Sequence, residues 1–458
     1  MKIALRGLLA GVAVLGLASS ISAQDAPEDL LPRESAPVIA PDVGPDEAVT
    51  VSEPVVQETA PVVQQTWPDV QVWSVAKATE LAQVIEGIGA EGLDPNEYGL
   101  AGLKMAIAGG AGDTLNQAAS ASFSWLAEDL RDGRTPMSAR RQWFVVDPDA
   151  ERMPTPQIMA AALTSGDIGG ALAQLNPTHP DYARLKAELA KTPATEKSKR
   201  KLIRANMDRW RWLARDLGDQ YLMTNVPEFQ LRLTVNDKIV RTYKTIVGKP
   251  GRTATPQLAE TVEGVIFNPT WTVPQSIVKG EGLGARVLGN PAYAKAKGYK
   301  ATRGANGYVS VVQQPGPGNA LGLMKLDMPN EHAIFLHDTP SRGLFNADVR
   351  ALSHGCIRTE RASELALTLA ILQAGIEAEE GVAILKSGKY TRVGFKQTMP
   401  VYITYFTMGV DIDGNLRSFN DIYGRDAPVL ESFDKPRQMN RARYSDEEVI
   451  VIEDDMRT

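Results

Sequence analysis

The spacing of apolar residues changes part-way along the chain, and this change limits the fold more than any other feature. Over residues 75–85, 123–130 and 182–189 apolar side chains recur at helical spacing. Residues 229–235 instead alternate strictly between apolar and polar side chains, Asn236-Asp237 makes a turn, and residues 239–243 follow. This second pattern is typical of a β-hairpin. The sequence therefore predicts an α+β protein, with a helical domain over 67–200 before a mainly β domain over 201–431.

The second half contains further predicted elements. Strands are expected at 264–268, 333–337, 382–386 and 401–410, with a turn at Asp413-Gly414. Residues 269–329, rich in Gly, Pro and Lys, form a long segment of the kind that serves as a lid or substrate loop, and we expect them to flank the active site. The basic stretch that ends at Lys201 is expected to lead into the β domain, and the charged tail over 432–458 is expected to be loosely ordered.

The first 66 residues predict export. Lys2 and Arg6 precede an apolar core over residues 7–17 and small residues that end at Ala23, the order of a secretory signal peptide over 1–23. The apolar core is shorter than the roughly 20 residues that span a bilayer, and no later segment is apolar enough to do so. Residues 24–66 are acidic and rich in proline, which predicts a disordered linker. We therefore expect a periplasmic protein with no transmembrane segment after signal removal, and a net charge of -6 gives no indication of nucleic-acid binding.

A single cysteine, Cys356, stands in this exported chain and cannot form an internal disulfide. A buried inert thiol or an intermolecular bridge would be the ordinary interpretation. Its neighbours favour another: a helical pattern over 362–372 follows, with Thr359 as a candidate N-cap, and the positive end of a helix favours thiolate. Gly355 lets backbone amides approach a developing oxyanion, so the N–H groups of Gly355 and Cys356 are candidate oxyanion donors.

A cysteine nucleophile needs a base, because free cysteine has a pKa of about 8.5. The chain has four histidines. His337 closes an apolar strand, where a side chain is held rigidly, whereas His354 lies two residues from Cys356; spacing alone does not choose between them. His332 is expected at the surface, and His179 in a loop.

Other functions fit these residues less well. A zinc site would need paired ligand spacings that the histidines and cysteine lack, so we predict no metal and no cofactor. A non-catalytic wall-binding scaffold would be plausible only if Cys356 or His337 were missing. Arg358 is either an ordinary surface cation or an anchor for a substrate carboxylate.

The strings that contain these residues resemble a known family. FLHDTPS around His337 and SHGCIR around Cys356 resemble the signature of the YkuD-type L,D-transpeptidases. FNPTWTVPQSI, GPGNALG, LFNADVRALSHGCIR, YITYFT and DIYGRD resemble the YcbB-like branch in particular, and GLDPNEYGL and LRDGRTP resemble the scaffold domain of that branch. Arg358 departs from the Asn common in the wider family but is usual in this branch, whereas the separate peptidoglycan-binding module that many members carry is not recognisable.

The resemblance implies a mostly β catalytic domain that acts on peptidoglycan stem peptides. It implies that Cys356 attacks the carbonyl between the L-centre of diaminopimelate and the terminal D-alanine of a tetrapeptide, releases D-alanine, and passes the acyl group to a second diaminopimelate amine. It assigns His337 as base, places His354 and Gly355 in the immediate site, and gives Ser353 a part in shaping the loop. A carbapenem is expected to acylate Cys356.

Three questions stay open in the sequence. An L,D-carboxypeptidase or a cross-link hydrolase would use the same Cys–His pair, with water in place of the amine. The group that orients His337 is either the neighbouring Asp338 or a backbone carbonyl. The acceptor amine, the oligomeric state and any protein partner are not indicated.

Overall fold

The computed structural model describes residues 69–273, 275–439 and 442–449. The predicted signal peptide (1–23) and linker (24–66) lie outside these residues. Within the described part of the chain, no helix combines the length and the apolar character that crossing a bilayer requires.

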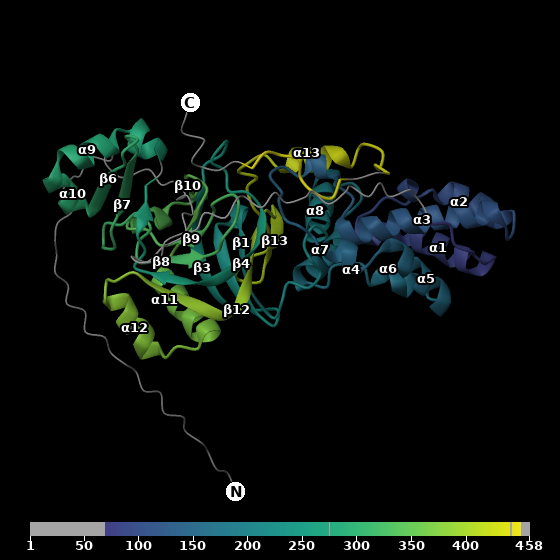
Figure 1. Ribbon diagram of the computed structural model, residues 1–458. Helices are drawn as coiled ribbons and strands as arrows, with labels where there is room; N and C mark the ends of the chain where they lie inside the picture. The colour runs from purple at the N-terminus through teal and green to yellow at the C-terminus, as the bar shows by residue number, and fades with distance from the viewer. Residues whose placement is uncertain (1–68, 274, 440–441, 450–458) are drawn as a thin grey trace, which may run out of the picture. The chain divides into compact units, whose positions relative to one another are not determined.

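The first described region is helical, as predicted. Its helices are α1 (Val75–Gly87), α2 (Leu100–Ala108), α3 (Asp113–Asp132), α4 (Asp149–Arg152), α5 (Thr155–Ser165), α6 (Ile168–Ala173) and α7 (Pro180–Lys191). In α1, the Ser74 hydroxyl caps the first turn by accepting a hydrogen bond from the Lys77 N–H, and Leu81 and Ile85 lie on the buried face. Leu126 and Leu130 of α3 are buried in the same core. Figure 1 shows α1, α2 and α3 grouped together, with α5 and α6 beside them.

Helix α8 (Lys197–Trp210) lies between the helical region and the first strand. Residues 197–201, which end the basic stretch, form its first turn, so the approach to the β domain is helical. Its charged side chains lie at the partly exposed start, whereas Ile203, Met207 and Trp210 are buried. The helix packs against the β region, since Arg209 forms a buried ion pair of 2.7 Å with Asp426.

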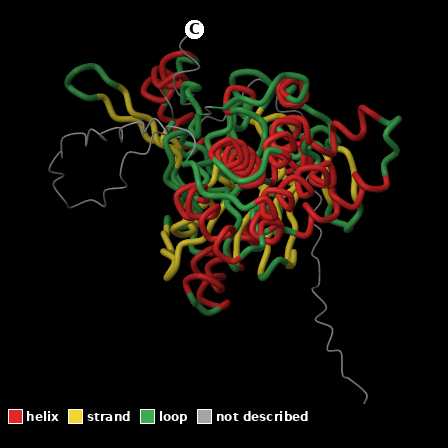
Figure 2. Tube along the Cα trace, turned by 90° about the vertical axis from the view of Figure 1, so that its right-hand side faces the viewer, coloured by secondary structure: helices red, strands yellow, loops and turns green. Residues whose placement is uncertain are grey.

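The second half is built on a closed sheet. Its strands are β1 (Gln220–Asn225), β2 (Gln230–Val235), β3 (Lys238–Gly248), β4 (Leu258–Phe267), β8 (Met324–Asp327), β9 (Leu336–His337), β10 (Ala351–Ser353), β11 (Ile357–Thr359) and β12 (Thr391–Thr404). Among the described residues the order is β10-β3-β11-β9-β8-β4-β12-β1-β2, and β2 also pairs with β3, so the sheet returns on itself. Helix α11 (Ala362–Leu369) buries Leu365 and Leu369 in the same core. Figure 2 shows that the structure contains both helices and strands, which confirms the predicted α+β class.

The predicted hairpin is confirmed, whereas two other predicted strands are wrong. Strands β2 and β3 pair antiparallel, and Asn236 and Asp237 take the positive φ values, 47° and 58°, that a tight hairpin turn requires. Residues 382–386 are not a strand, because they end helix α12 (Ala378–Lys386), with acidic residues in its first turn. Of the predicted strand 333–337, only Leu336–His337 is paired as β9, since Ala333 has a φ of 52° that breaks extended pairing.

The segment 269–329 carries its own structure. It contains β5 (Trp271–Thr272), a π-helical turn (Ser276–Gly280), α9 (Leu283–Gly289), α10 (Pro291–Lys297), β6 (Tyr299–Arg303) and β7 (Val309–Gln313). The order β5-β7-β6 forms a small antiparallel sheet, and Figure 1 shows α9 and α10 next to it. The end of the segment reaches the histidine strand, because the Leu323 N–H donates to the Asp338 carboxylate at 2.9 Å.

The described part of the C-terminal tail corrects a further prediction. After β13 (Met408–Val410), β14 (Leu416–Ser418) and α13 (Asp426–Ser432), the chain returns to the helical region. Arg437 is buried and forms ion pairs of 3.0 Å with both Glu128 and Asp129 of α3. The Glu447 carboxylate accepts a hydrogen bond from the Gln142 N–H. The tail is therefore not loosely ordered at these positions, because buried carboxylates on α3 bind it.

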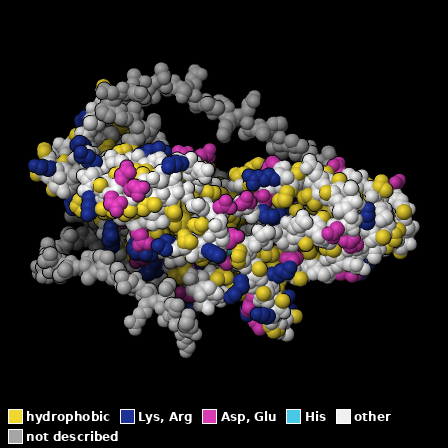
Figure 3. Space-filling model, turned by 90° about the horizontal axis from the view of Figure 1, so that it is seen from below, with side chains coloured by type: hydrophobic (Ala, Val, Ile, Leu, Met, Phe, Trp, Pro, Cys, Tyr) yellow, Lys and Arg dark blue, Asp and Glu magenta, His cyan; other side chains and the backbone are white. Residues whose placement is uncertain are grey.

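Charged side chains of both signs are mixed on the surface. Figure 3 shows Lys and Arg side chains interspersed with Asp and Glu on the face seen from below. Several form exposed ion pairs, such as Lys104 with Glu86 and Arg392 with Asp327. On this face, charge of one sign is not gathered over a large area.

Candidate active site

The cysteine lies on a short turn between two strands that share a neighbour. β10 pairs with β3 in parallel and β11 pairs with β3 antiparallel, so the chain reverses between Ser353 and Ile357. Gly355 allows this reversal, because its φ of 123° is a conformation that side chains with a Cβ rarely adopt. We call residues 353–356 the cysteine loop. His354 is half-buried on it, and Cys356 is 4% exposed.

The helix that follows Cys356 does not start where the sequence predicted. Thr359 is a buried residue of β11 and not an N-cap, and α11 begins only at Ala362, after Arg361 in a left-handed conformation. Leu372, the last residue of the helical pattern predicted over 362–372, is 50% exposed. The helix-terminus argument for a thiolate therefore does not apply, and activation of the thiol must come from other groups.

Two hydroxyl groups hold the backbone of the cysteine loop. The Ser353 hydroxyl donates to the Cys356 carbonyl at 2.6 Å and accepts from the Gly355 N–H at 3.2 Å. The Thr255 hydroxyl donates to the Gly355 carbonyl at 2.7 Å. This arrangement fits the role in loop shape that the resemblance implied for Ser353. The Gly355 N–H, one of the two predicted oxyanion donors, is thus bound to the Ser353 hydroxyl.

The thiol is enclosed by the segment that leads into β9. Cys356 Sγ lies 3.7 Å from the carbonyl oxygen of Ala333, and the Ile357 N–H donates to the Phe335 carbonyl at 3.0 Å. These contacts fix the loop against residues 333–335. The nucleophile candidate and the histidine candidate are therefore carried by adjacent, hydrogen-bonded strands.

The strand register places His337 and Arg358 on one face. In the parallel pair of β11 and β9, Ile357 is opposite Leu336 and Arg358 is opposite His337. Because residues at matching positions of paired strands point to the same side of the sheet, the His337 and Arg358 side chains share a face. Cys356 comes directly before β11, at the end of the cysteine loop. The cysteine loop and the strand that carries His337 are therefore neighbours in the sheet.

Burial keeps the His337 imidazole neutral. Loss of solvation lowers its pKa to about 3, and the positive charges of Arg358 and Lys325 act in the same direction, whereas a hydrogen bond with the Asp338 backbone opposes them. At neutral pH this ring carries no charge and has one nitrogen able to accept a proton. A neutral imidazole can accept a proton, which a general base requires, although its low pKa makes it a weak base in this state.

Asp338 does not orient His337 through its carboxylate. Its side chain accepts a hydrogen bond from the Leu323 N–H and pairs with Arg342 at 3.2 Å. Gly322 lies against it, since a Cβ at that position would meet the carboxylate oxygen at 2.4 Å. The Asp338 backbone, by contrast, raises the pKa of His337 and so acts against the effect of burial.

The other histidines are placed differently. His332, expected at the surface, is buried, and its ring lies 4.3 Å from that of Phe144, so burial lowers its pKa. His179 caps α7 and stacks on Trp210 at 4.2 Å, and burial lowers its pKa to about 4. Among the described residues, no group of three or more His, Cys, Asp or Glu side chains is arranged to hold a metal ion.

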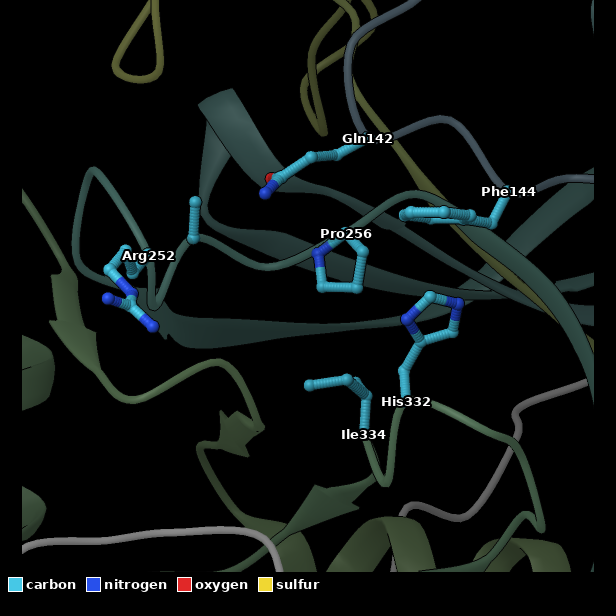
Figure 4. Close-up of a pocket in the computed structure, with 7 residues that line it drawn as sticks. Gln142, Phe144, Arg252, Pro256, His332 and Ile334 are labelled. Carbon is cyan, nitrogen blue, oxygen red and sulfur yellow. The ribbon is translucent and has the colours of Figure 1, made fainter. Parts of the chain in front are cut away.

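A recess lies beside the cysteine loop. Figure 4 shows its labelled lining residues, which are Gln142, Phe144, Arg252, Pro256, His332 and Ile334. Three of its lining residues are sequence neighbours of residues that contact the cysteine loop. Pro256 follows Thr255, which hydrogen-bonds to Gly355. His332 and Ile334 flank Ala333, whose carbonyl contacts the Cys356 thiol. The Phe144 and His332 rings meet on one side, and Arg252 extends along the other (Figure 4). The recess therefore offers apolar surface and polar groups next to the nucleophile candidate.

The sequence did not single out Thr255 or the residues that support it. Thr255 is buried and reaches the cysteine loop across a separation of 100 residues. Tyr423 and Arg425 contact Thr255 from behind. They belong to the string DIYGRD, which was noted only as a family likeness. The signal was present, but only long-range pairing in the fold shows what these residues touch.

Comparison with known proteins agrees with this geometry. The model of the L,D-transpeptidase catalytic domain, YkuD, matches residues 219–403, and the model of the scaffold domain matches residues 67–189. A Haemophilus influenzae protein named "Putative L,D-transpeptidase" is 30% identical over 223 residues, which span 45% of this chain and 45% of that protein.

Solved L,D-transpeptidases give weaker matches. The enzyme from Mycobacterium smegmatis is 15% identical, with 41% of this chain and 58% of that chain covered and a TM-score of 0.20. L,D-transpeptidase 1 from Mycobacterium tuberculosis is 13% identical, with 41% and 61% covered and a TM-score of 0.18.

The two matched models place a scaffold domain over the helical region and an L,D-transpeptidase catalytic domain over the β-rich region. The chain therefore contains an L,D-transpeptidase catalytic domain, and Cys356 and His337 both lie within the matched residues.

Proposed function

We propose that this protein forms peptidoglycan cross-links between diaminopimelate residues through a thioester on Cys356. The observation that carries the proposal is the pairing of a buried cysteine on a glycine turn with a neutral, buried histidine on the adjacent strand. The catalytic-domain match over 219–403 supplies the reaction class.

The proposed reaction begins with proton transfer. His337 accepts the thiol proton of Cys356, and the resulting thiolate attacks the carbonyl that joins the L-centre of diaminopimelate to the terminal D-alanine. The tetrahedral intermediate collapses as the C–N bond breaks, His337 returns the proton to the leaving amine, and D-alanine departs. A thioester remains on Cys356.

The second half of the reaction mirrors the first. The side-chain amine of a second diaminopimelate attacks the thioester carbonyl and gives a proton to His337, and the new amide forms as the C–S bond breaks. The proton then returns to the Cys356 sulfur. No proton or electron is gained or lost over the cycle, so neutral His337 is regenerated.

Arg358 and the recess are proposed to bind substrate. Arg358 lies opposite His337 in the register and is 9% exposed, so its guanidinium is a candidate to bind a carboxylate of the stem peptide near the reacting bond. Phe144, which lines the recess and is partly exposed, is proposed to contact an apolar portion of the stem peptide.

A hydrolase is the second candidate function. An L,D-carboxypeptidase or a cross-link hydrolase would use the same thioester, with water in place of the amine. The end of the segment 269–329 favours the transferase, because Leu323 contacts the residue after His337 and structure there can limit entry of water.

Export to the periplasm and membership of the YcbB-like branch are part of the same proposal. A peptidoglycan substrate lies outside the cytoplasm, which agrees with the sequence of residues 1–23. The strings DIYGRD and LRDGRTP support the branch. Fractionation of cells that produce the full chain would show a shortened, periplasmic protein, and retention of the full-length chain in the cytoplasm would contradict export.

The products formed from muropeptides test the reaction. The protein without residues 1–23 is incubated with disaccharide-tetrapeptides, alongside a Cys356→Ala variant, and products are identified by mass. Dimers that have lost D-alanine, absent with the variant, are the expected result. Tripeptides without dimers would show the hydrolase, and dimers formed equally by the variant would contradict the assignment of Cys356.

A further inference from the structure

The peptide unit between Gly355 and Cys356 is held by one buried side chain. The Gly248 N–H donates to the Thr255 hydroxyl oxygen at 2.9 Å, so the hydroxyl hydrogen is directed elsewhere. It points to the Gly355 carbonyl, which it meets at 2.7 Å. Thr255 thus fixes this carbonyl toward the interior of the sheet.

Fixing the carbonyl also fixes the direction of the Cys356 N–H. In a planar trans peptide the C=O and N–H bonds point in opposite directions, and among the described residues every peptide bond is trans. The hydrogen bond from Thr255 therefore turns the Cys356 N–H away from the interior, toward the side of the loop opposite Thr255. An N–H on the nucleophile's own residue is well placed to bind the oxygen that becomes negative in the tetrahedral intermediate.

Two further polar backbone groups of the loop are bound to Ser353. Ser353 holds the Gly355 N–H and the Cys356 carbonyl. Of the two N–H groups that the sequence suggested as oxyanion donors, the one on Cys356 is therefore the one whose direction depends on Thr255. Gly355 permits the sharp reorientation, with a φ of 123°.

Residues of the DIYGRD string hold Thr255 in turn. The Thr255 N–H donates to the Tyr423 hydroxyl at 3.3 Å, and that hydroxyl donates to the Gly248 carbonyl at 2.6 Å. The Arg425 guanidinium donates to the Thr255 carbonyl at 3.2 Å. Tyr423 is itself fixed, because its N–H donates to the Tyr405 hydroxyl at 2.8 Å. All of these groups lie away from the reacting atoms.

We propose that Thr255 is a positioning residue that aims the Cys356 N–H at the developing oxyanion, and that Tyr423 supports it. The proposal rests on the proposed acyl-transfer function and adds residues that the family signature around Cys356 and His337 does not include. It explains why a buried hydroxyl and the DIYGRD string meet behind the cysteine loop.

Two reactions of the Cys356 thiol can distinguish a role of Thr255 in aiming the Cys356 N–H from a role in holding the whole cysteine loop in place. Acylation by a carbapenem passes through an oxyanion, whereas alkylation by iodoacetamide displaces iodide and does not. Rates of both are measured by intact mass for the wild type and for Thr255→Val, Thr255→Ser, Thr253→Val and Tyr423→Phe. Thr253 is the matched control, because its hydroxyl lies in the same segment but bonds weakly to the Lys249 carbonyl at 3.4 Å.

The expected result is a selective loss. Removal of a whole oxyanion donor costs about 100- to 1,000-fold, so a misaimed donor in Thr255→Val is expected to slow acylation by about 10- to 100-fold. The rate of alkylation of Thr255→Val should differ from that of the wild type by less than about threefold, because alkylation forms no oxyanion. Thr255→Ser should restore acylation, Thr253→Val should match the wild type, and Tyr423→Phe should show a smaller loss of the same selectivity.

Two results would overturn the proposal. One is wild-type acylation by Thr255→Val, and the other is an equal loss of acylation and alkylation, which would show that the whole loop had moved. If Thr255→Val does not fold, Tyr423→Phe decides by the same ratio of acylation loss to alkylation loss. If the wild type is alkylated by iodoacetamide but not acylated by the carbapenem, the result counts against the proposed function instead. In that case p-nitrophenyl acetate, whose reaction also passes through an oxyanion, is used to measure the acylation rates of the variants.

Discussion

Replacement of His337 by glutamine should remove a pH dependence from the stability of the protein. In the unfolded chain a histidine has a pKa of about 6.5, whereas burial lowers the pKa of His337 in the fold to about 3. Between these values the unfolded state binds more protons than the folded state, so the free energy of unfolding rises with pH. The stabilisation due to neutral His337 is complete above about pH 6.5 and is lost as the pH falls toward 3.

The size of the effect follows from the same two pKa values. At pH 5 the unfolded imidazole is almost fully protonated and the folded one almost fully neutral. Linkage then gives a loss of about 2 kcal/mol in unfolding free energy between pH 7 and pH 5. His337→Gln cannot titrate, so it should lack this contribution, while Asp147, Glu228 and the other shifted groups titrate alike in both proteins.

Urea denaturation of the wild type and of His337→Gln at pH 7 and pH 5 measures this difference. The account predicts that the wild type loses about 2 kcal/mol more than the variant over this interval. Equal pH dependence in the two proteins would refute the reasoning, because it would mean that His337 is protonated in the fold as readily as in the unfolded chain. An imidazolium could not act as the base for Cys356.

Two further predictions concern residues around the site and between the domains. Gly322→Ala should destabilise the protein by about 2–4 kcal/mol, because the new Cβ would overlap the Asp338 carboxylate. Gly307 has a similar positive φ but open space around it, so Gly307→Ala should cost only about 1–2 kcal/mol. Equal losses in urea would show that backbone strain alone matters. Arg437→Ala should cost about 3–5 kcal/mol, because two buried carboxylates of α3 lose their partner. Arg443→Ala, a more exposed cation on the same tail, should change the unfolding free energy by less than about 1 kcal/mol, and a similar loss in both would contradict burial as the cause.

The spacing of apolar residues and the identity of turn residues predicted those helices and turns whose conformation depends mainly on neighbours in the sequence. The β2–β3 hairpin follows from strict alternation and from Asn236-Asp237, which tolerate positive φ. α3 follows from apolar residues at helical spacing. The run over 382–386 was misassigned, since a short apolar stretch is compatible with either period, and its acidic first turn and packing made it the end of α12.

The remaining errors involve partners that are distant in sequence. Ile357–Thr359 was read as leading into a helix, but β3 and β9 on its two sides make it a strand. The tail was read as loose because its charges seemed to need water, yet Arg437 meets two carboxylates some 300 residues earlier. Spacing could not choose between His337 and His354 as the base, and only the family resemblance assigned His337. The register of β9 and β11 shows that the strand of His337 lies next to the strand that follows Cys356.

The mass of a trapped reaction intermediate tests the central claim most directly. The protein without residues 1–23 is mixed with a tetrapeptide donor in the absence of an acceptor amine, quenched in acid within the first turnover, and analysed intact and after digestion. The account predicts an adduct equal to the donor minus D-alanine, located on Cys356 and absent from Cys356→Ala. Release of D-alanine with an adduct on another residue, or with the variant as active as the wild type, would contradict it.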